Sequence, residues 1–287
     1  MSINGRDTEP GAATVSVFDR GFLFGDAIYE VARTVGRRPF HLQDHLDRLE
    51  RSGEAIGLDV RPLRAPLEAE IARLIAQTPG DEELVIRLMI TRGSAPRLDI
   101  DDVEGPPVWI VWVKRMARPS PELRRRGMRL MSVEPDALVA RISPGVKSNN
   151  RQANVMAHRL AREAGFDDGL FVDPVGLVTE GPTWNLFLVR GGTLITPPLE
   201  RGILAGITRS LVLEHARKLG IPTEEREVPL EEARAADEMF ITSTTRGVMP
   251  VGALDERTFT LPGPITERVS AALEGDYLPE SPAGRSA

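Results

Sequence analysis

The 287-residue chain contains no cysteine. Disulfide bonds, thiolate nucleophiles and metal sites with cysteine ligands are therefore excluded. The sequence also lacks any hydrophobic run near the roughly 18 residues of a membrane-spanning helix. Its longest run, at 108–113, has only the length of a strand. The first 20 residues lack the basic start and apolar stretch of a secretion signal. We therefore expect a cytoplasmic protein with no membrane partner.

Lysine is almost absent. The 36 basic residues are 33 arginines and only three lysines, Lys114, Lys147 and Lys218. Lys218 lies in the last turn of a predicted helix, where a cation stabilises the carbonyl end. Lys114 ends an apolar strand, and we expect it to point to solvent. Lys147 lies in a Pro-Gly-Val-Lys-Ser-Asn-Asn segment between a strand and a helix. In a chain that otherwise uses arginine, it indicates either an amine that must lose its proton or an ordinary surface cation.

Several familiar sites are also missing. The formal net charge of -6 gives no electrostatic reason to bind nucleic acid. There is no G-x-S-x-G elbow, no phosphate-binding P-loop and no G-x-G-x-x-G fingerprint. His41 and His45 have the spacing of a metal-binding pair on one helix face, but Leu42 stands where a zinc protease has glutamate. We expect both histidines to be structural and the protein to hold no metal.

The hydrophobic pattern predicts an α+β protein of two domains. A smaller N-terminal α/β domain is expected over 1–118, a linker with two prolines and three arginines over 119–128, and a larger domain over 129–287. Strands are predicted at 13–18, 29–35, 39–41, 84–91, 108–113, 170–172, 177–179, 186–189, 194–196 and 239–242. Helices are predicted from residue 42, at 66–75, 154–164 and 208–219, and after residue 230.

Two segments of the predicted larger domain are typical of anion sites. Residues 202–209 lead into a helix, whose first N–H groups and Thr208 hydroxyl would bind a phosphate. Ser243, Thr244 and Thr245 follow a predicted strand and supply a second group of hydroxyls and amides. Each segment alone is also typical of a helix cap or turn. Together with a lysine that forms a Schiff base, they indicate a site for a phosphorylated aldehyde.

Six segments carry a resemblance that covers nearly the whole chain. They are FDRGFLFGDAIYE (18–30), FHLQDHLDRL (40–49), VKSNNRQANVMA (146–157), GLVTEGPTWNLF (176–187), GILAGITR (202–209) and ITSTTRGVMPV (241–251). In this order they resemble the pyridoxal-phosphate enzymes of aminotransferase class IV, also called fold type IV. That group holds D-amino-acid transaminases, branched-chain aminotransferases and aminodeoxychorismate lyases. The resemblance implies a β-barrel-like sheet in the larger domain, pyridoxal 5'-phosphate as cofactor and a homodimer.

The resemblance also implies roles for single residues. Lys147 resembles the lysine that forms the Schiff base and then moves the substrate proton. Glu180 resembles the carboxylate that keeps the cofactor's pyridine nitrogen protonated. The other implied cofactor contacts are Arg48, Ile207, Thr208 and Thr244 at the phosphate and Leu204 on one face of the ring.

Substrate recognition is less uniform within the resemblance. Tyr29 and Arg97 resemble the carboxylate trap of D-amino-acid transaminases, in which the arginine comes from the partner subunit. That subgroup has a histidine two residues after the arginine, and Asp99 stands there in this chain. Arg33 is closer to an arginine of branched-chain and lyase members. The further implied substrate contacts are the backbone N–H groups of Thr244 and Thr245.

The function favoured by these residues is a transaminase that passes an amino group from an amino acid to a 2-oxo acid in a ping-pong cycle. A D-amino-acid subgroup is favoured. The alternatives are a branched-chain L-amino-acid aminotransferase and an aminodeoxychorismate lyase. A binding protein that kept the fold and lost the chemistry is a further alternative, against which both Lys147 and Glu180 argue.

Overall fold

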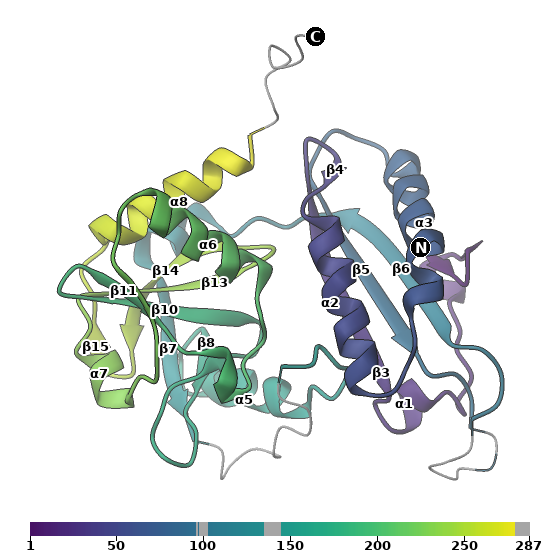
Figure 1. Ribbon diagram of the computed structural model, residues 1–287, viewed down its shortest axis with the longest axis horizontal. Coiled ribbons are helices and arrows are strands. Elements are labelled where there is room, and N and C mark those ends of the chain that lie inside the picture. Colours follow the sequence, from purple (N-terminus) through teal and green to yellow (C-terminus); the bar gives the residue numbers. More distant parts are fainter. Residues whose placement is uncertain (96, 98–102, 135–144, 279–287) are drawn as a thin grey trace. The chain divides into compact units, whose positions relative to one another are not determined.

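The structure is a computed structural model that describes residues 1–95, 97, 103–134 and 145–278 (Figure 1). The chain divides into two compact units, one formed by residues 1–117 with 146–150 and the other by 118–145 with 151–287. The segment 146–150, which contains Lys147, therefore belongs to the first unit, although the chain on both sides of it belongs to the second.

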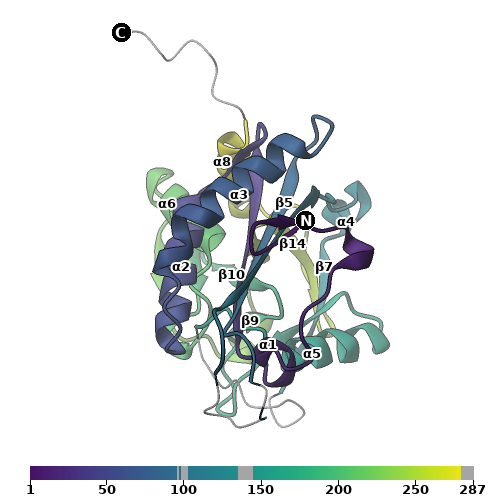
Figure 2. The same cartoon turned by 90° about the vertical axis from the view of Figure 1, so that its right-hand side faces the viewer.

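The first unit is an antiparallel sheet with two helices on one face (Figure 2). Strand order is β2-β1-β6-β5-β3-β4. Helices α2 and α3 cover one face because their apolar residues recur at helical spacing and meet the inward residues of β3, β5 and β6. The strands are β1 (Ser2–Ile3), β2 (Arg6–Asp7), β3 (Ala27–Val35), β4 (Arg38–Pro39), β5 (Leu84–Thr91) and β6 (Val108–Arg115). The helices are η1 (Pro10–Ala12), α1 (Arg20–Leu23), α2 (Leu42–Ala55), η2 (Arg61–Leu63) and α3 (Arg64–Gln77).

The second unit is a mixed sheet that curls into half of a barrel. Its strand order is β12-β11-β10-β13-β14-β7-β8, with β9 paired to β10 and β15 paired to β14. The strands are β7 (Met128–Val133), β8 (Asp168–Phe171), β9 (Glu180–Gly181), β10 (Trp184–Arg190), β11 (Thr193–Thr196), β12 (Thr223–Glu225), β13 (Glu238–Ser243), β14 (Gly247–Leu254) and β15 (Arg257–Thr258). The helices are α4 (Pro121–Arg126), α5 (Gln152–Glu163), η4 (Leu199–Arg201), α6 (Ile207–Lys218), α7 (Leu230–Arg234) and α8 (Pro264–Asp276). The predicted α+β class is therefore confirmed.

Most predicted elements are confirmed, including the long helices and the central strands of both sheets. The strand predicted at 13–18 is wrong: residues 13–16 are irregular, and 17–18 form a turn before the cap of α1. At 177–179 the chain forms isolated bridges instead of a strand. The strand expected at 39–41 ends at Pro39, because His41 is the N-cap residue of α2. Strands β7 and β14 and helix α8 were not predicted. In β14, Pro250 and Gly252 interrupt the apolar run, which is unusual within a strand.

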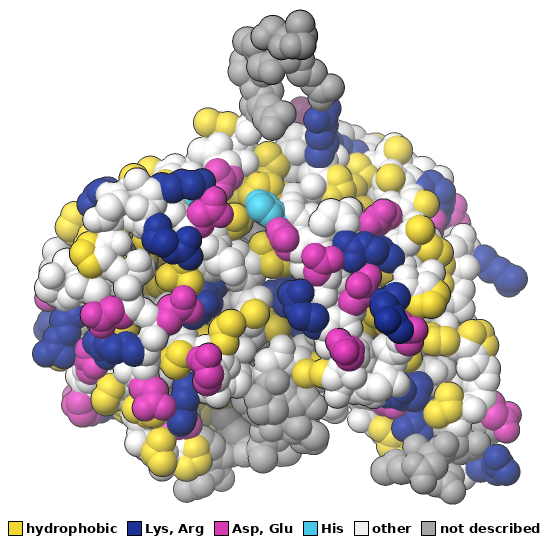
Figure 3. Space-filling view, in the orientation of Figure 1, with side chains coloured by type: hydrophobic (Ala, Val, Ile, Leu, Met, Phe, Trp, Pro, Cys, Tyr) yellow, Lys and Arg dark blue, Asp and Glu magenta, His cyan; other side chains and the backbone are white. Residues whose placement is uncertain are grey.

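The viewed surface carries acidic and basic side chains side by side, without a broad patch of one sign (Figure 3). This agrees with the weak net charge of the chain. In the part of the chain that the structure describes, no helix is both long enough and apolar enough to cross a bilayer.

Candidate active site

Backbone hydrogen bonds hold the segment that contains Lys147 beside strand β3. Tyr29 N donates to Lys147 O at 3.0 Å, and Asn149 N donates to Ala27 O at 2.9 Å. These bonds make 146–150 a short antiparallel neighbour of β3, with Ser148 opposite Ile28. Because side chains alternate between the faces of paired strands, Lys147 lies on the same face as Tyr29. Its Nζ is 4.7 Å from the centre of the Tyr29 ring.

Gly25 makes this arrangement possible. Its φ of 68° is in the left-handed region, and a Cβ at this position would lie 2.3 Å from Asn150 Oδ1. A side chain there would displace the segment that carries Lys147. The glycine in the family-like segment 18–30 therefore has a structural reason, which is the close approach of residues 146–150.

Arg87 lies on the same face as Lys147, and the sequence reasoning missed it. Its Cζ is 4.5 Å from the centre of the Tyr29 ring and 5.3 Å from that of Trp112. Burial lowers the pKa of the Arg87 guanidinium. Among the described residues, its buried Nε has no hydrogen-bond partner. A buried donor of this kind is suited to an incoming carboxylate. The signal in the sequence was a single arginine inside the apolar strand LVIRLMIT.

The opposite face of β3 holds a buried charge cluster of Glu30, His45 and Arg48. Glu30 Oε1 accepts from Arg48 Nε at 2.6 Å, and Glu30 Oε2 pairs with Arg48 Nη2 and His45 Nδ1, each at 2.8 Å. Burial pushes the pKa of Glu30 upward, but Arg48 and His45 outweigh it and hold the pKa well below its ordinary value. Burial lowers the pKa of His45. The phosphate-binding arginine of the prediction is thus part of an ion pair.

In the second unit, Glu180 on β9 is buried and held by two donors. Asn185 Nδ2 and the backbone N of Leu204 each lie 3.0 Å from Glu180 Oε2. Asn185 Nδ2 also donates to Leu204 O at 2.9 Å. The turn stays close because residue 206 is glycine: a Cβ there would lie 2.0 Å from Asn185 Oδ1. Glu180 and Leu204, which the sequence predicts at one site, are in direct contact.

The predicted phosphate donors of the second unit lie at the start of a helix and in a turn between two strands. Ile207 and Thr208 open α6, and its N-cap Gly206 supplies no side-chain bond to the first N–H groups. Thr244 and Thr245 form the turn between β13 and β14. Two neighbouring hydroxyls, Thr242 Oγ1 and Ser243 Oγ, are buried and lack a hydrogen-bond partner among the described residues. Such groups are suited to a bound polar ligand.

The remaining predicted substrate residues have different surroundings. Arg33 is buried on β3 and its Nε donates to Thr34 O at 3.3 Å. Arg97 is exposed, and Asp99 lies outside the described residues. Trp184, which is outside this predicted set, is buried, and its Nε1 donates to Asp168 Oδ2 at 2.8 Å, so it anchors the loop after Glu180.

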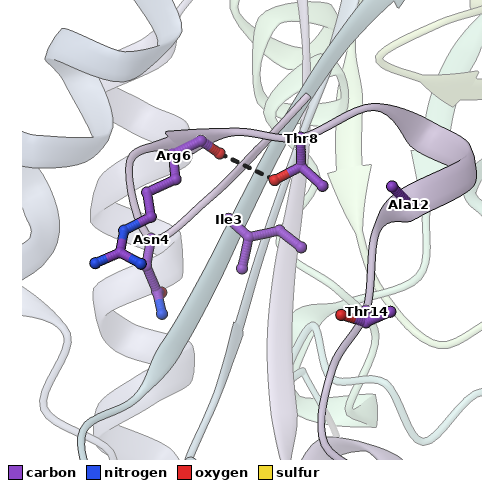
Figure 4. Close-up of a pocket in the computed structure, with 6 residues that line it drawn as sticks. All are labelled: Ile3, Asn4, Arg6, Thr8, Ala12 and Thr14. Atoms are coloured by element: carbon purple, nitrogen blue, oxygen red, sulfur yellow. Dashed lines mark hydrogen bonds between the residues drawn. The ribbon is translucent and has the colours of Figure 1, made fainter.

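The N-terminal hairpin borders a cavity that lies apart from these residues. Among the described residues, no group of three acidic or histidine side chains could hold a metal ion. A cavity of about 510 Å³ opens beside the N-terminal hairpin, where Thr8 Oγ1 donates to Arg6 O (Figure 4). Its lining contains no nucleophile or titratable pair, so it offers no chemistry. The residues lining it are Ile3, Asn4, Arg6, Thr8, Ala12 and Thr14.

Comparison with known proteins bears on the residues of both units. Residues 27–254 match the family model described as amino-transferase class IV. The chain is 34% identical over 280 residues to a D-alanine aminotransferase of Bacillus licheniformis, covering 97% of each protein. A branched-chain aminotransferase of Thermoproteus uzoniensis has a similar structure, with a TM-score of 0.87, 30% identity and coverage of 95% and 92%. A 4-amino-4-deoxychorismate lyase of Pseudomonas aeruginosa has a TM-score of 0.81, 31% identity and coverage of 96% and 98%.

Proposed function

Because the chain belongs to the class IV aminotransferases, we propose that it moves an amino group from an amino acid to a 2-oxo acid in a ping-pong cycle, with pyridoxal 5'-phosphate as cofactor. We favour a D-amino-acid donor, which the relative from Bacillus licheniformis supports. The observation that carries the proposal is the position of Lys147, one of three lysines, on the same face as Tyr29 and Arg87. The buried Nε of Arg87 has no hydrogen-bond partner in the part of the chain that the structure describes.

The residues present fit this cofactor. It needs an amine, a carboxylate for its ring nitrogen and several donors for its phosphate, and we assign these to Lys147, to Glu180 and to the groups at the start of α6. The buried Ser243 hydroxyl, which has no hydrogen-bond partner within the described ranges, supports a polar ligand beside the β13–β14 turn. When bound, pyridoxal phosphate supplies an electron-accepting ring for the reacting carbon. The further contacts we propose are Arg48, Ile207, Thr208 and Thr244 for the phosphate and Leu204 for the ring face.

The protein's own groups then have distinct tasks. The Lys147 amine would take the proton from the substrate Cα and deliver it to the cofactor C4′ in the same half-reaction, and the second half of the cycle would run this transfer in reverse. Glu180 holds a negative charge toward the ring nitrogen, and the bonds from Asn185 and Leu204 N keep its carboxylate in one orientation. Because Glu180 is buried, its charge acts with little screening by water.

For the substrate carboxylate we propose Arg87 together with Tyr29. The guanidinium lies against the ring whose other neighbour is the Lys147 amine. An anion at Arg87 would supply the partner that the buried Nε lacks among the described residues. Arg33, Arg97, Thr244 and Thr245 remain the other proposed substrate contacts.

Replacing Arg87 by glutamine should lower kcat/KM for amino and 2-oxo acids about 10- to 100-fold, because a charged hydrogen bond to the carboxylate is lost. Most of the loss should be in KM, measured by steady-state kinetics. Arg115→Gln is the matched control, since Arg115 is exposed at the end of β6 and pairs with Glu82. Equal kinetics for both variants would contradict the assignment of Arg87.

A lyase that releases pyruvate from aminodeoxychorismate is the second candidate, favoured by the likeness to the lyase from Pseudomonas aeruginosa. The two reactions differ in their need for an acceptor. A transaminase given a donor alone converts its bound cofactor once and then stops. A lyase turns over continuously without a 2-oxo acid.

The test is a half-reaction screen on the protein loaded with pyridoxal phosphate. D- and L-alanine, D- and L-glutamate and L-leucine are added singly, and the visible absorbance of the bound cofactor is followed. We expect one equivalent of 2-oxo acid from at least one D-amino acid, and recovery of the absorbance when a 2-oxo acid is added. Continuous pyruvate release from aminodeoxychorismate would favour the lyase. No response to any compound would favour a binding protein.

We further propose that the protein is a homodimer and is cytoplasmic. Sedimentation of the purified protein tests the oligomeric state, and fractionation of the cells tests the location.

A further inference from the structure

The buried cluster on the helix side of β3 is a set of hydrogen bonds around one carboxylate. Glu30 is fully buried. It accepts two bonds from Arg48, one from His45 and a longer one of 3.2 Å from Val31 N. Three of these bonds end on Oε2 and one on Oε1, so the carboxylate is held from several sides. His45 and Arg48 both reach it because residues three apart share one face of α2.

The hydrogen bond between His45 and Glu30 determines which nitrogen of the imidazole ring carries a proton. Since Glu30 is ionised, its oxygens can only accept, and His45 must carry a proton on Nδ1. Only 2% of the His45 side chain is exposed, so water cannot replace this bond. Glu30 on β3 and Arg48 on its own helix lie beside it, and the charge of Lys147, which is on the other face of β3, also acts on it.

We infer that His45 is a positioning residue, whose Nδ1–H fixes Glu30 and thereby the orientation of the Arg48 guanidinium for the cofactor phosphate. The inference rests on the proposed role of Arg48. If the histidine donor is lost, one carboxylate position in a buried site stands empty. Arg48 already donates to both oxygens, and its guanidinium can turn toward the vacated position. A rotated guanidinium would then no longer present the same N–H groups to a phosphate, whose recognition depends on that geometry.

The test compares two ligands that differ only in the phosphate. Dissociation constants for pyridoxal 5'-phosphate and for pyridoxal are measured by absorbance on the cofactor-stripped protein, and their ratio reports the phosphate contact. Four variants are used. His45→Leu removes the donor, His45→Gln moves it farther from the backbone, His45→Asn keeps an N–H near the Nδ1 position, and Arg48→Leu removes the guanidinium. Thermal unfolding of each variant shows that it is folded.

We expect the preference for pyridoxal phosphate over pyridoxal to fall about 10-fold in His45→Leu and His45→Gln, and to stay within about 3-fold of the parent in His45→Asn. Arg48→Leu should lose at least as much. If Arg48→Leu loses the preference while the leucine and glutamine variants keep it, the role of His45 is overturned. Equal weakening of both ligands in those variants would indicate a structural role only and also overturn it. An unchanged preference in Arg48→Leu would refute the proposed phosphate contact itself, and the role of His45 with it.

Discussion

Replacing Lys147 by alanine is expected to abolish amino-group transfer, with a loss of at least about 10³-fold in kcat. The variant loses both the amine that joins the cofactor and the base that moves the substrate proton. No other described lysine can take over, because Lys114 is exposed at the end of β6 and Lys218 pairs with Glu214 on the surface of α6. The measurement is the rate of 2-oxo acid formation from the best donor of the half-reaction screen.

Lys218→Ala is the matched control, since it removes an amine from a surface pair worth only a few tenths of a kcal/mol. Its turnover should equal that of the parent protein. The visible absorbance of bound cofactor should be lost in Lys147→Ala and kept in Lys218→Ala. Turnover that survives in Lys147→Ala would remove the central residue of the proposed function.

The importance of Lys147 could be suspected from composition alone, because the chain holds only three lysines. Glu180 and Arg48 could not be found that way. Arg48 stands among other charged residues and Glu180 is one of 42 acidic residues, and only the family resemblance singled them out. The elements around them were easier to predict. The apolar residues of α2 and α6 have clear helical spacing, and Gly220 marks the end of α6.

Other features depend on pairing between distant segments. Arg87 meets Tyr29 only through the register of β3 with β5, in which Val31 faces Arg87. The place of 146–150 beside β3 depends on hydrogen bonds across more than a hundred residues. No local pattern encodes these contacts. The strand predicted at 13–18 was wrong for a related reason: Val15, Val17 and Phe18 are exposed, so their apolar character does not reflect burial in a sheet.

The second large effect is expected in stability. Glu30→Gln should lower the melting temperature by about 10 °C, because it leaves the Arg48 guanidinium buried without a counter-charge, at a cost of about 3–5 kcal/mol. Glu82→Gln is the control, since it removes a carboxylate from an exposed pair with Arg115 in the same unit. That change should cost less than about 1 kcal/mol. Thermal unfolding of the cofactor-stripped proteins measures both, and a shift in Glu30→Gln no larger than the control's would contradict this reading of the cluster.

The double variant Glu30→Leu/Arg48→Met separates stability from function. Replacing a whole buried ion pair by apolar side chains of similar volume is often neutral or stabilising. We therefore expect the double variant to recover most of the melting temperature lost in Glu30→Gln. It should nevertheless bind pyridoxal phosphate no better than pyridoxal, because the guanidinium is gone. That outcome would mean that folding does not need the buried charges and that the cluster serves anion binding. If the double variant unfolds as early as Glu30→Gln, the cluster is instead required for the packing of α2 on β3.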